Sequence, residues 1–240
     1  MPKSISMFIP AYNEAKHLKH TIDTIERVRI QNGIQSNQIE YIIVDDGSDD
    51  ATGEIAESLA RNSSNIKVIH NILNRGLGYN LKVAIAEATK DYFGLIPGDN
   101  ETTIETINII CHEIQNNHYD IYVPYQANSQ ARPLMRRILS RIYTSMFNLL
   151  FRMKLRYYNG LCFSRLPILK KAKLMTDGPS YMAGILIQLI KQHQATYKEI
   201  PMYVNSQPGR KSRLLKWKNV YRIAKHIFDL KQHLRTAPLT

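Results

Sequence analysis

The chain has 240 residues, of which 44% are apolar, and this composition excludes an intrinsically disordered protein. Its formal net charge of +12 predicts an anionic partner: nucleic acid, an acidic membrane surface or a phosphorylated substrate. No apolar run reaches the roughly 18 residues of a membrane-spanning helix. The chain enters a strand almost at once, and the two cysteines lie far apart, so we expect no signal peptide and a cytoplasmic location.

Short apolar runs alternate with helical patterns along the first half of the chain. Strands are expected at residues 5–9, 40–44, 66–69, 92–96 and 121–123, with helices between them and a helix over 104–114. This alternation predicts a mainly parallel, Rossmann-like sheet with helices on both faces. Loops that follow parallel strands gather at one edge, so residues 10–14, 45–48 and 99–101 should meet in space.

Two carboxylates follow one of these strands. Asp99 and Glu101 come directly after the turn signal Pro97-Gly98, which ends the run at 92–96. Oxygen ligands suit Mg²⁺ or Mn²⁺, and Mg²⁺ typically takes one or two carboxylates together with substrate phosphates. In a chain this basic, the pair predicts a divalent cation held over a phosphate, and a solvated loop or a helix N-cap is the alternative.

Past residue 125 the chain becomes more basic. Residues 138–151 predict a long apolar helix, 157–163 a strand or turn, 182–190 a helix, 196–200 a strand and 214–234 a basic amphipathic helix. The last helix suits a membrane interface beside anionic lipid, and packing on the rest of the protein is the alternative.

Four stretches of the first half occur in the order found in family 2 glycosyltransferases. Residues 6–14 resemble the opening strand and turn of that family, 44–52 its second motif, 74–81 its third and 95–101 its metal motif. Within the family the chain is most similar to polyprenyl-phosphate sugar transferases of the dolichol-phosphate mannose synthase kind. The resemblance implies a GT-A fold, which is an α/β fold, and a nucleotide-sugar donor.

The resemblance also implies roles for residues of the first half. Asp46 would accept hydrogen bonds from the base, Asp99 would bind the metal that bridges the diphosphate, and Glu101 would complete its shell. The remaining nucleotide-sugar contacts would come from Pro10, Ala11, Tyr12, Glu14 and Gly47. Family members usually have another Asp where this chain has Pro97, so this metal site has one carboxylate fewer. Water would replace that ligand, or basic side chains would neutralise more of the charge, or the site is degenerate.

Basic residues of the second half are matched to the phosphates. Residues 209–213 resemble a loop that closes over the diphosphate, which makes Arg210 catalytic and Lys211 a donor contact, and a solvated basic loop is the alternative. Arg137 matches an arginine that binds the acceptor phosphate, and guanidinium groups suit phosphate geometry. A second such arginine is absent, because Tyr125-Gln126 stands in its place. Arg132 and Arg136 lie near Arg137 in sequence and suit the same role, unless they form a solvated basic face.

We therefore expect a GT-A domain over residues 1–213, with a nucleotide-sugar half at 1–124 and an acceptor half at 125–213, followed by a helix at 214–240. The predicted reaction is inverting, metal-dependent transfer from a GDP- or UDP-sugar to a lipid-linked phosphate, by a protein peripheral to the cytoplasmic membrane face. A hydroxyl acceptor with Asp177 as general base is one alternative. A non-catalytic binding module is another, and nucleic-acid binding has only the net charge in its favour.

Overall fold

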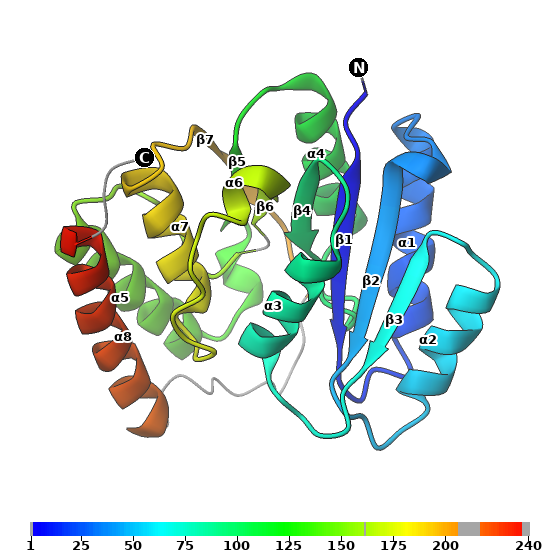
Figure 1. Cartoon of the computed structure of the whole chain (residues 1–240), viewed down its shortest axis with the longest axis horizontal. Coiled ribbons are helices and arrows are strands. Elements are labelled where there is room, and N and C mark those ends of the chain that lie inside the picture. Colours follow the sequence, from blue (N-terminus) through cyan, green and yellow to red (C-terminus); the bar gives the residue numbers. More distant parts are fainter. Residues whose placement is uncertain (1, 161, 206–216, 237–240) are drawn as a thin grey trace.

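A seven-stranded sheet runs through the protein (Figure 1), whose computed structural model describes residues 2–160, 162–205 and 217–236. The strand order is β3-β2-β1-β4-β6-β5-β7. The strands of the first half are β1 (Ile5–Ala11), β2 (Ile39–Asp45), β3 (Ile66–His70), β4 (Tyr92–Leu95) and β5 (Ile121–Gln126). The second half contributes β6 (Phe163–Arg165) and β7 (Tyr197–Met202). Strands β1 to β4 are parallel to one another, so the expected α/β fold with a mainly parallel sheet is confirmed.

Helices cover both faces of this sheet. On one face α1 contacts both α2 and α4, whereas α3 packs against β1 and β2 from the other face (Figure 1). The helices are α1 (Leu18–Gln31), α2 (Thr52–Arg61), α3 (Leu77–Glu87), α4 (Ile104–Asn116), α5 (Leu134–Phe151), α6 (Leu166–Leu169), α7 (Tyr181–Lys191) and α8 (Trp217–Thr236), with 3₁₀ turns η1 (Ser36–Gln38) and η2 (Ser129–Ala131). Helix α4 starts where its sequence predicts, because the Thr103 hydroxyl accepts a hydrogen bond from the Thr106 amide.

Strand β6 is the main feature that the sequence pattern does not locate. It is three residues long and antiparallel to both β4 and β5, between which it lies. Its insertion depends on Gly94 in β4, because a Cβ at this position would overlap the ring of Phe163. The predicted strand or turn at 157–163 therefore ends where the real strand begins.

The C-terminal helix α8 packs on the rest of the protein with one face. Leu230 is fully buried, and His226 lies against α7 at Gly184. Val220, Tyr221 and Phe228 stay exposed on the other side of the helix. Among the described residues no helix is long and apolar enough to cross a membrane.

Candidate active site

Backbone hydrogen bonds join three loops at the carboxyl edge of the parallel strands. The Asp46 amide donates to the Ala11 carbonyl at 2.9 Å, and the Gly98 amide donates to the Pro10 carbonyl at 3.1 Å. The Glu14 amide donates to the Thr52 hydroxyl at 2.8 Å, which ties the first loop to the start of α2. The structure thus brings together the segments 10–14, 45–48 and 99–101, as the sequence predicts.

Asp46 holds the loop that precedes α3. Its buried carboxylate accepts hydrogen bonds from the amides of Arg75 at 2.8 Å and Gly76 at 2.9 Å, and from the Asn71 side chain at 2.9 Å. The sequence resemblance assigns this carboxylate to the nucleobase, a contact that stays a prediction. A carboxylate has about four lone-pair sites, so three hydrogen bonds leave capacity for a further donor.

Gly47 is required by the same loop. Its φ of +71° is in the left-handed region, and a Cβ there would lie 2.8 Å from the backbone carbon of Leu73. The turn after β2 and the loop before α3 can approach each other only because this residue has no side chain. Gly47 is therefore needed by the backbone, whatever ligand the edge binds.

A histidine links the end of β2 to α2, and no motif in the sequence predicts it. The two ring nitrogens of His70 lie 3.1 Å from Asp45 and 3.0 Å from Glu57. The hydrogen bond to Glu57 is the largest cause of a raised pKa of His70, and Asp45 adds to it. The Asp45 carboxylate also accepts a hydrogen bond from the Ser48 amide at 3.1 Å. The His70 cluster, which consists of His70, Asp45 and Glu57, therefore stabilises the turn that carries Asp46.

The two predicted metal ligands occupy a tight turn after β4. Asp99 is 7% exposed and accepts a hydrogen bond from the Glu101 amide at 3.0 Å. Asn100 between them has a φ of +56°, in the left-handed region that asparagine tolerates better than most residues. The Thr21 hydroxyl donates to the Gly98 carbonyl and holds the turn against α1.

The donor set of this turn suits a cation that is shared with a ligand. In the described part of the chain, no group of three His, Cys, Asp or Glu side chains is placed to hold a metal ion. The turn offers two carboxylates, with Pro97 where the family has another acid. Mg²⁺ is commonly bound by one or two carboxylates plus substrate phosphates, so these residues fit a metal held jointly with a diphosphate.

The segment after β7 runs along the Asp99 turn. The Asn205 amide donates to the Glu101 carbonyl at 2.9 Å, and the Asn205 side chain donates to the Asn100 carbonyl at 3.2 Å. Thr102 and Val204 form a β-bridge beside them. The predicted Arg210 and Lys211 lie outside the described residues.

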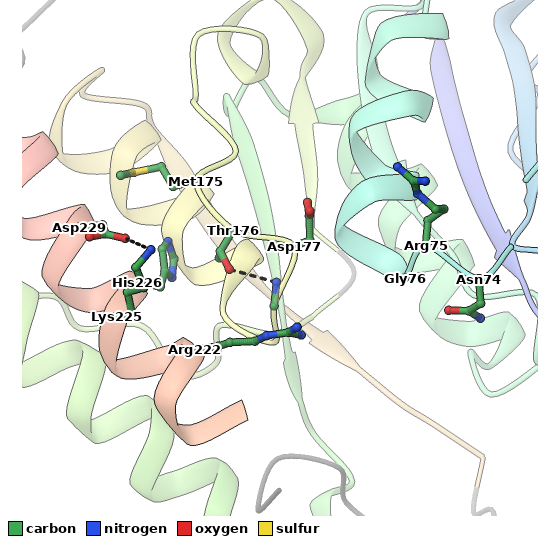
Figure 2. A pocket seen from close by; sticks show the side chains of 11 residues that line it. Asn74, Arg75, Gly76, Met175, Thr176, Asp177, Arg222, Lys225, His226 and Asp229 are labelled. Atoms are coloured by element: carbon green, nitrogen blue, oxygen red, sulfur yellow. Dashed lines mark hydrogen bonds and ion pairs between the residues drawn. The ribbon is translucent and has the colours of Figure 1, made fainter. Parts of the chain in front are cut away.

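A cavity of about 560 Å³ opens between the loop before α3, the loop before α7 and helix α8 (Figure 2). Figure 2 shows Arg75 on one side, Arg222 and Lys225 of α8 on the other, and Asp177 between them. The backbone of Asp177 packs closely on Gly78, where a Cβ would lie 2.5 Å from the Asp177 Cα. Sequence reasoning selected Asp177 but not the two α8 cations, because only the tertiary structure brings that helix to the cavity.

The predicted acceptor arginines lie around the start of α5. The Arg132 guanidinium donates to the Tyr157 hydroxyl at 3.2 Å, which links this region to the loop before β6. The buried polar atoms without a hydrogen-bond partner among the described residues include two nitrogen donors of this region, the Nε atom of Arg137 and the Nε2 atom of Gln126. Buried donors are nearly always paired in proteins, so these two are candidates for binding an anionic ligand.

Sequence comparison assigns the chain to a family. The model of glycosyl transferase family 2 matches residues 6–193. The uncharacterized glycosyltransferase EpsJ of Bacillus subtilis is 32% identical over 117 residues, which cover 49% of this chain and 32% of that protein. The dolichol-phosphate mannosyltransferase of Pyrococcus furiosus is 31% identical over 112 residues, which cover 47% of this chain and 30% of that protein. The dolichyl-phosphate beta-glucosyltransferase of Dictyostelium discoideum is 30% identical over 124 residues, which cover 49% and 38%.

Solved structures share the fold across almost the whole chain. Glucosyl-3-phosphoglycerate synthase from Mycobacterium tuberculosis, in complex with uridine diphosphate, superposes with a TM-score of 0.71 at 17% identity and covers 95% of this chain and 80% of that one. TarS from S. aureus superposes with a TM-score of 0.64 at 18% identity, and the match covers 95% of this chain and 65% of the TarS chain. The matched part spans well under half the length of the curated relatives named above. The family match, which covers most of the chain, together with the shared fold shows that this protein belongs to glycosyl transferase family 2 and has its GT-A architecture.

Proposed function

We propose that this protein is an inverting, metal-dependent glycosyltransferase that moves a sugar from a nucleotide-sugar to a polyprenyl phosphate at the cytoplasmic membrane face. One observation carries the proposal: the Asp99 turn is hydrogen-bonded to the end of β1, within the same loop cluster that holds Asp46. Departure of a nucleoside diphosphate develops negative charge, and a divalent cation supplies the electrostatic stabilisation that this step needs. Asp99 and Glu101 would hold that ion.

The loop after β1 supplies the nucleotide contacts in this proposal. The loop is held by backbone hydrogen bonds at the carboxyl edge of the parallel strands and carries Pro10, Ala11, Tyr12 and Glu14. The Tyr12 side chain is 42% exposed there. An exposed ring beside fixed backbone is suited to cover a nucleobase. The hydrogen bonds of the loop to Ser48 and Thr52 fix its shape before a ligand binds.

The acceptor half offers unpaired donors to a phosphate. The buried Nε atom of Arg137 supports a role in binding the acceptor phosphate, with Arg132 and Arg136 nearby in sequence. Tyr125-Gln126 stands where the family pattern has a second arginine, and the buried amide nitrogen of Gln126 would be a neutral replacement for that donor. A phosphate acceptor is ionised near neutral pH, so the transfer needs cations for positioning rather than a general base.

A donor panel tests this proposal. Nucleotide release from GDP- and UDP-sugars is followed with Mg²⁺ or Mn²⁺, with and without a short polyprenyl phosphate. We expect release from one donor that depends on the lipid and falls at least about a hundredfold in Asp99→Asn, in line with the loss of a main electrostatic group. Asp49→Asn is the matched control, because that carboxylate is exposed on the neighbouring loop. Lack of nucleotide binding and of release with every donor would instead favour a non-catalytic binding module.

The cavity in Figure 2 favours a second candidate, transfer to a hydroxyl acceptor. Asp177 lines that cavity beside Arg75 and is the nearest acid to the place where the family has its base. A hydroxyl acceptor needs a general base within hydrogen-bond reach. Under this candidate Asp177→Asn abolishes transfer and keeps donor affinity, whereas under the first proposal transfer to polyprenyl phosphate survives the change.

A further inference from the structure

Helix α5 has one face that is fixed in the protein interior. Tyr143, Phe147 and Phe151 are buried along it. The rings of Tyr143 and Phe147 are 4.7 Å apart between centroids, and Phe147 lies 5.5 Å from Tyr158. This aromatic contact determines how the helix is rotated against the rest of the protein, and hence which side chains face outward.

The outward face of α5 is apolar. Leu134 is 65% exposed, Ile138 41%, Ile142 60% and Leu149 81%. At about 100° per residue these four positions lie within an arc of about 80°, roughly opposite the buried aromatic face. We call these four residues the α5 stripe. The exposed Ser145 lies between Ile142 and Leu149 in this arc, and the other three apolar side chains follow one another at four-residue spacing. Large exposed apolar side chains gathered on one helix face mark an interaction surface.

The charge around the α5 stripe restricts its partner. The helix contains arginines but no acidic residue, and Arg141 is exposed at the border of the stripe. Arg152, Lys154 and Arg156 follow the helix and are also exposed. The sequence has no Asp or Glu between Asp120 and Asp177. The matching partner is apolar and negatively charged. A second copy of the chain would bring like charges together.

We propose that α5 is the membrane-docking surface of this protein and lies in the interface of a bilayer that contains anionic lipid. The α5 stripe would reach the boundary of the acyl chains, while Arg141 and Arg152 would lie among the headgroups. Docking also brings the start of α5, which carries Arg137, to the membrane depth where a polyprenyl phosphate presents its phosphate. That last link rests on the proposed function, whereas the docking itself does not require turnover.

The sequence offers the tail helix as a membrane-interface helix, with packing on the protein as the alternative. Helix α8 uses Leu230 and His226 to pack against the protein and leaves Val220, Tyr221 and Phe228 exposed. Both α5 and α8 lie at the end of the molecule away from α1 and α2 (Figure 1). Among the side chains that the structure describes, fewer large apolar ones are exposed on α8 than on α5, so we assign the membrane contact to α5.

Co-sedimentation with lipid vesicles tests the proposal on the full chain. Vesicles of phosphatidylcholine alone are compared with vesicles that also contain phosphatidylglycerol, at low and high NaCl. We expect binding to the anionic vesicles that weakens with salt, since headgroup attraction is screened. Ile142→Glu and Leu149→Glu should each weaken it by about tenfold or more, because each removes an apolar contact and adds a like charge to the surface facing anionic lipid.

A matched control comes from the far side of the molecule. Ile30 on α1 is 65% exposed, close to the value for Ile142, and Ile30→Glu should leave vesicle binding unchanged. Arg141→Gln should reduce the preference for anionic over neutral vesicles. Absence of binding to anionic vesicles, or an equal loss in Ile30→Glu, would overturn the proposal. So would a dimer of the wild-type protein in light scattering that Ile142→Glu converts to monomer.

Different experimental results would reject the docking surface and the proposed reaction. In detergent with a short polyprenyl phosphate, transfer by Ile142→Glu should equal that of the wild type, because no membrane is needed there. Transfer without vesicle binding by the wild type would reject the docking surface and keep the reaction. Vesicle binding without transfer would keep the surface and reject the reaction.

Discussion

The Asp46 carboxylate accepts a hydrogen bond from the Gly76 amide at 2.9 Å, and this bond joins the turn after β2 to the start of α3. A second bond from the Arg75 amide, at 2.8 Å, completes the attachment. Because Arg75 and Gly76 also line the cavity with Asp177, the Asp46 side chain connects the carboxyl edge of the parallel strands to the cavity wall.

Asp46→Asn should therefore affect both stability and donor binding. An amide oxygen replaces a charged acceptor, and hydrogen bonds to charged groups contribute about 1.5–3 kcal/mol each, so we expect a loss of about 1–3 kcal/mol in unfolding free energy. Urea unfolding followed by circular dichroism measures the loss, and calorimetry measures donor affinity. Asp49→Asn on the same loop, where the carboxylate is exposed, should change neither quantity.

Gly94→Ala should destabilise the sheet where β6 enters it. The added methyl group would overlap the Phe163 ring, and overpacking of a dense core costs about 1–3 kcal/mol. Phe163→Leu in the same chain should recover part of this loss, which a double-mutant cycle of unfolding free energies would show. Additive effects of the two changes would mean that the contact does not limit the packing.

The His70 cluster should make stability depend on pH in one direction. Its folded-state pKa is raised above 6.5, mainly by Glu57 and also by Asp45. The stabilising contribution is therefore fully present below pH 6.5 and is lost as the pH rises through the raised pKa. Melting temperatures of the wild type and His70→Gln should differ most below pH 6.5 and converge as the pH rises through the raised pKa of His70. A constant difference across that range would contradict the assignment.

His226, at the contact between α7 and α8, should make stability depend on pH in the opposite direction. Its ring lies 2.7 Å from the Ser180 hydroxyl and is 3% exposed, and burial lowers its pKa below 6.5. The unfolded chain then binds the proton more readily, so the contribution is present above pH 6.5 and is lost as the pH falls through the lowered pKa. The protection factors of the α8 amides, which correct for the slower intrinsic exchange at low pH, should fall on acidification in the wild type. His226→Gln should remove that pH dependence.

Arg137→Gln should weaken acceptor binding selectively. Guanidinium binds phosphate through charge-assisted hydrogen bonds, so its loss should raise the KM for a short polyprenyl phosphate by about tenfold or more. The KM of the donor should stay within about twofold, because Arg137 lies in the part of the chain that the proposal assigns to the acceptor. Arg61→Gln on the exposed surface of α2 controls for the general loss of one positive charge. An equal rise in both KM values would point to a structural role for Arg137.

The sequence by itself determined the parallel sheet and its carboxyl edge. Apolar runs such as residues 40–44 end in acidic turns, and parallel strands place all such turns at one edge, so Asp46 and Asp99 could be predicted to meet there. These features depend on local pattern and on the direction of the strands. They do not require knowledge of which distant side chains touch.

Only the tertiary structure decided how the second half is arranged. Strand β6 depends on the absence of a side chain at Gly94, a contact between residues far apart in the chain. Arg222 reaches the cavity only because α8 folds back on α7. Helix α5 is apolar on two opposite sides, so its periodicity does not distinguish the core from the surface. The aromatic contact of Phe147 with Tyr158 settles that choice and leaves Ile142 exposed.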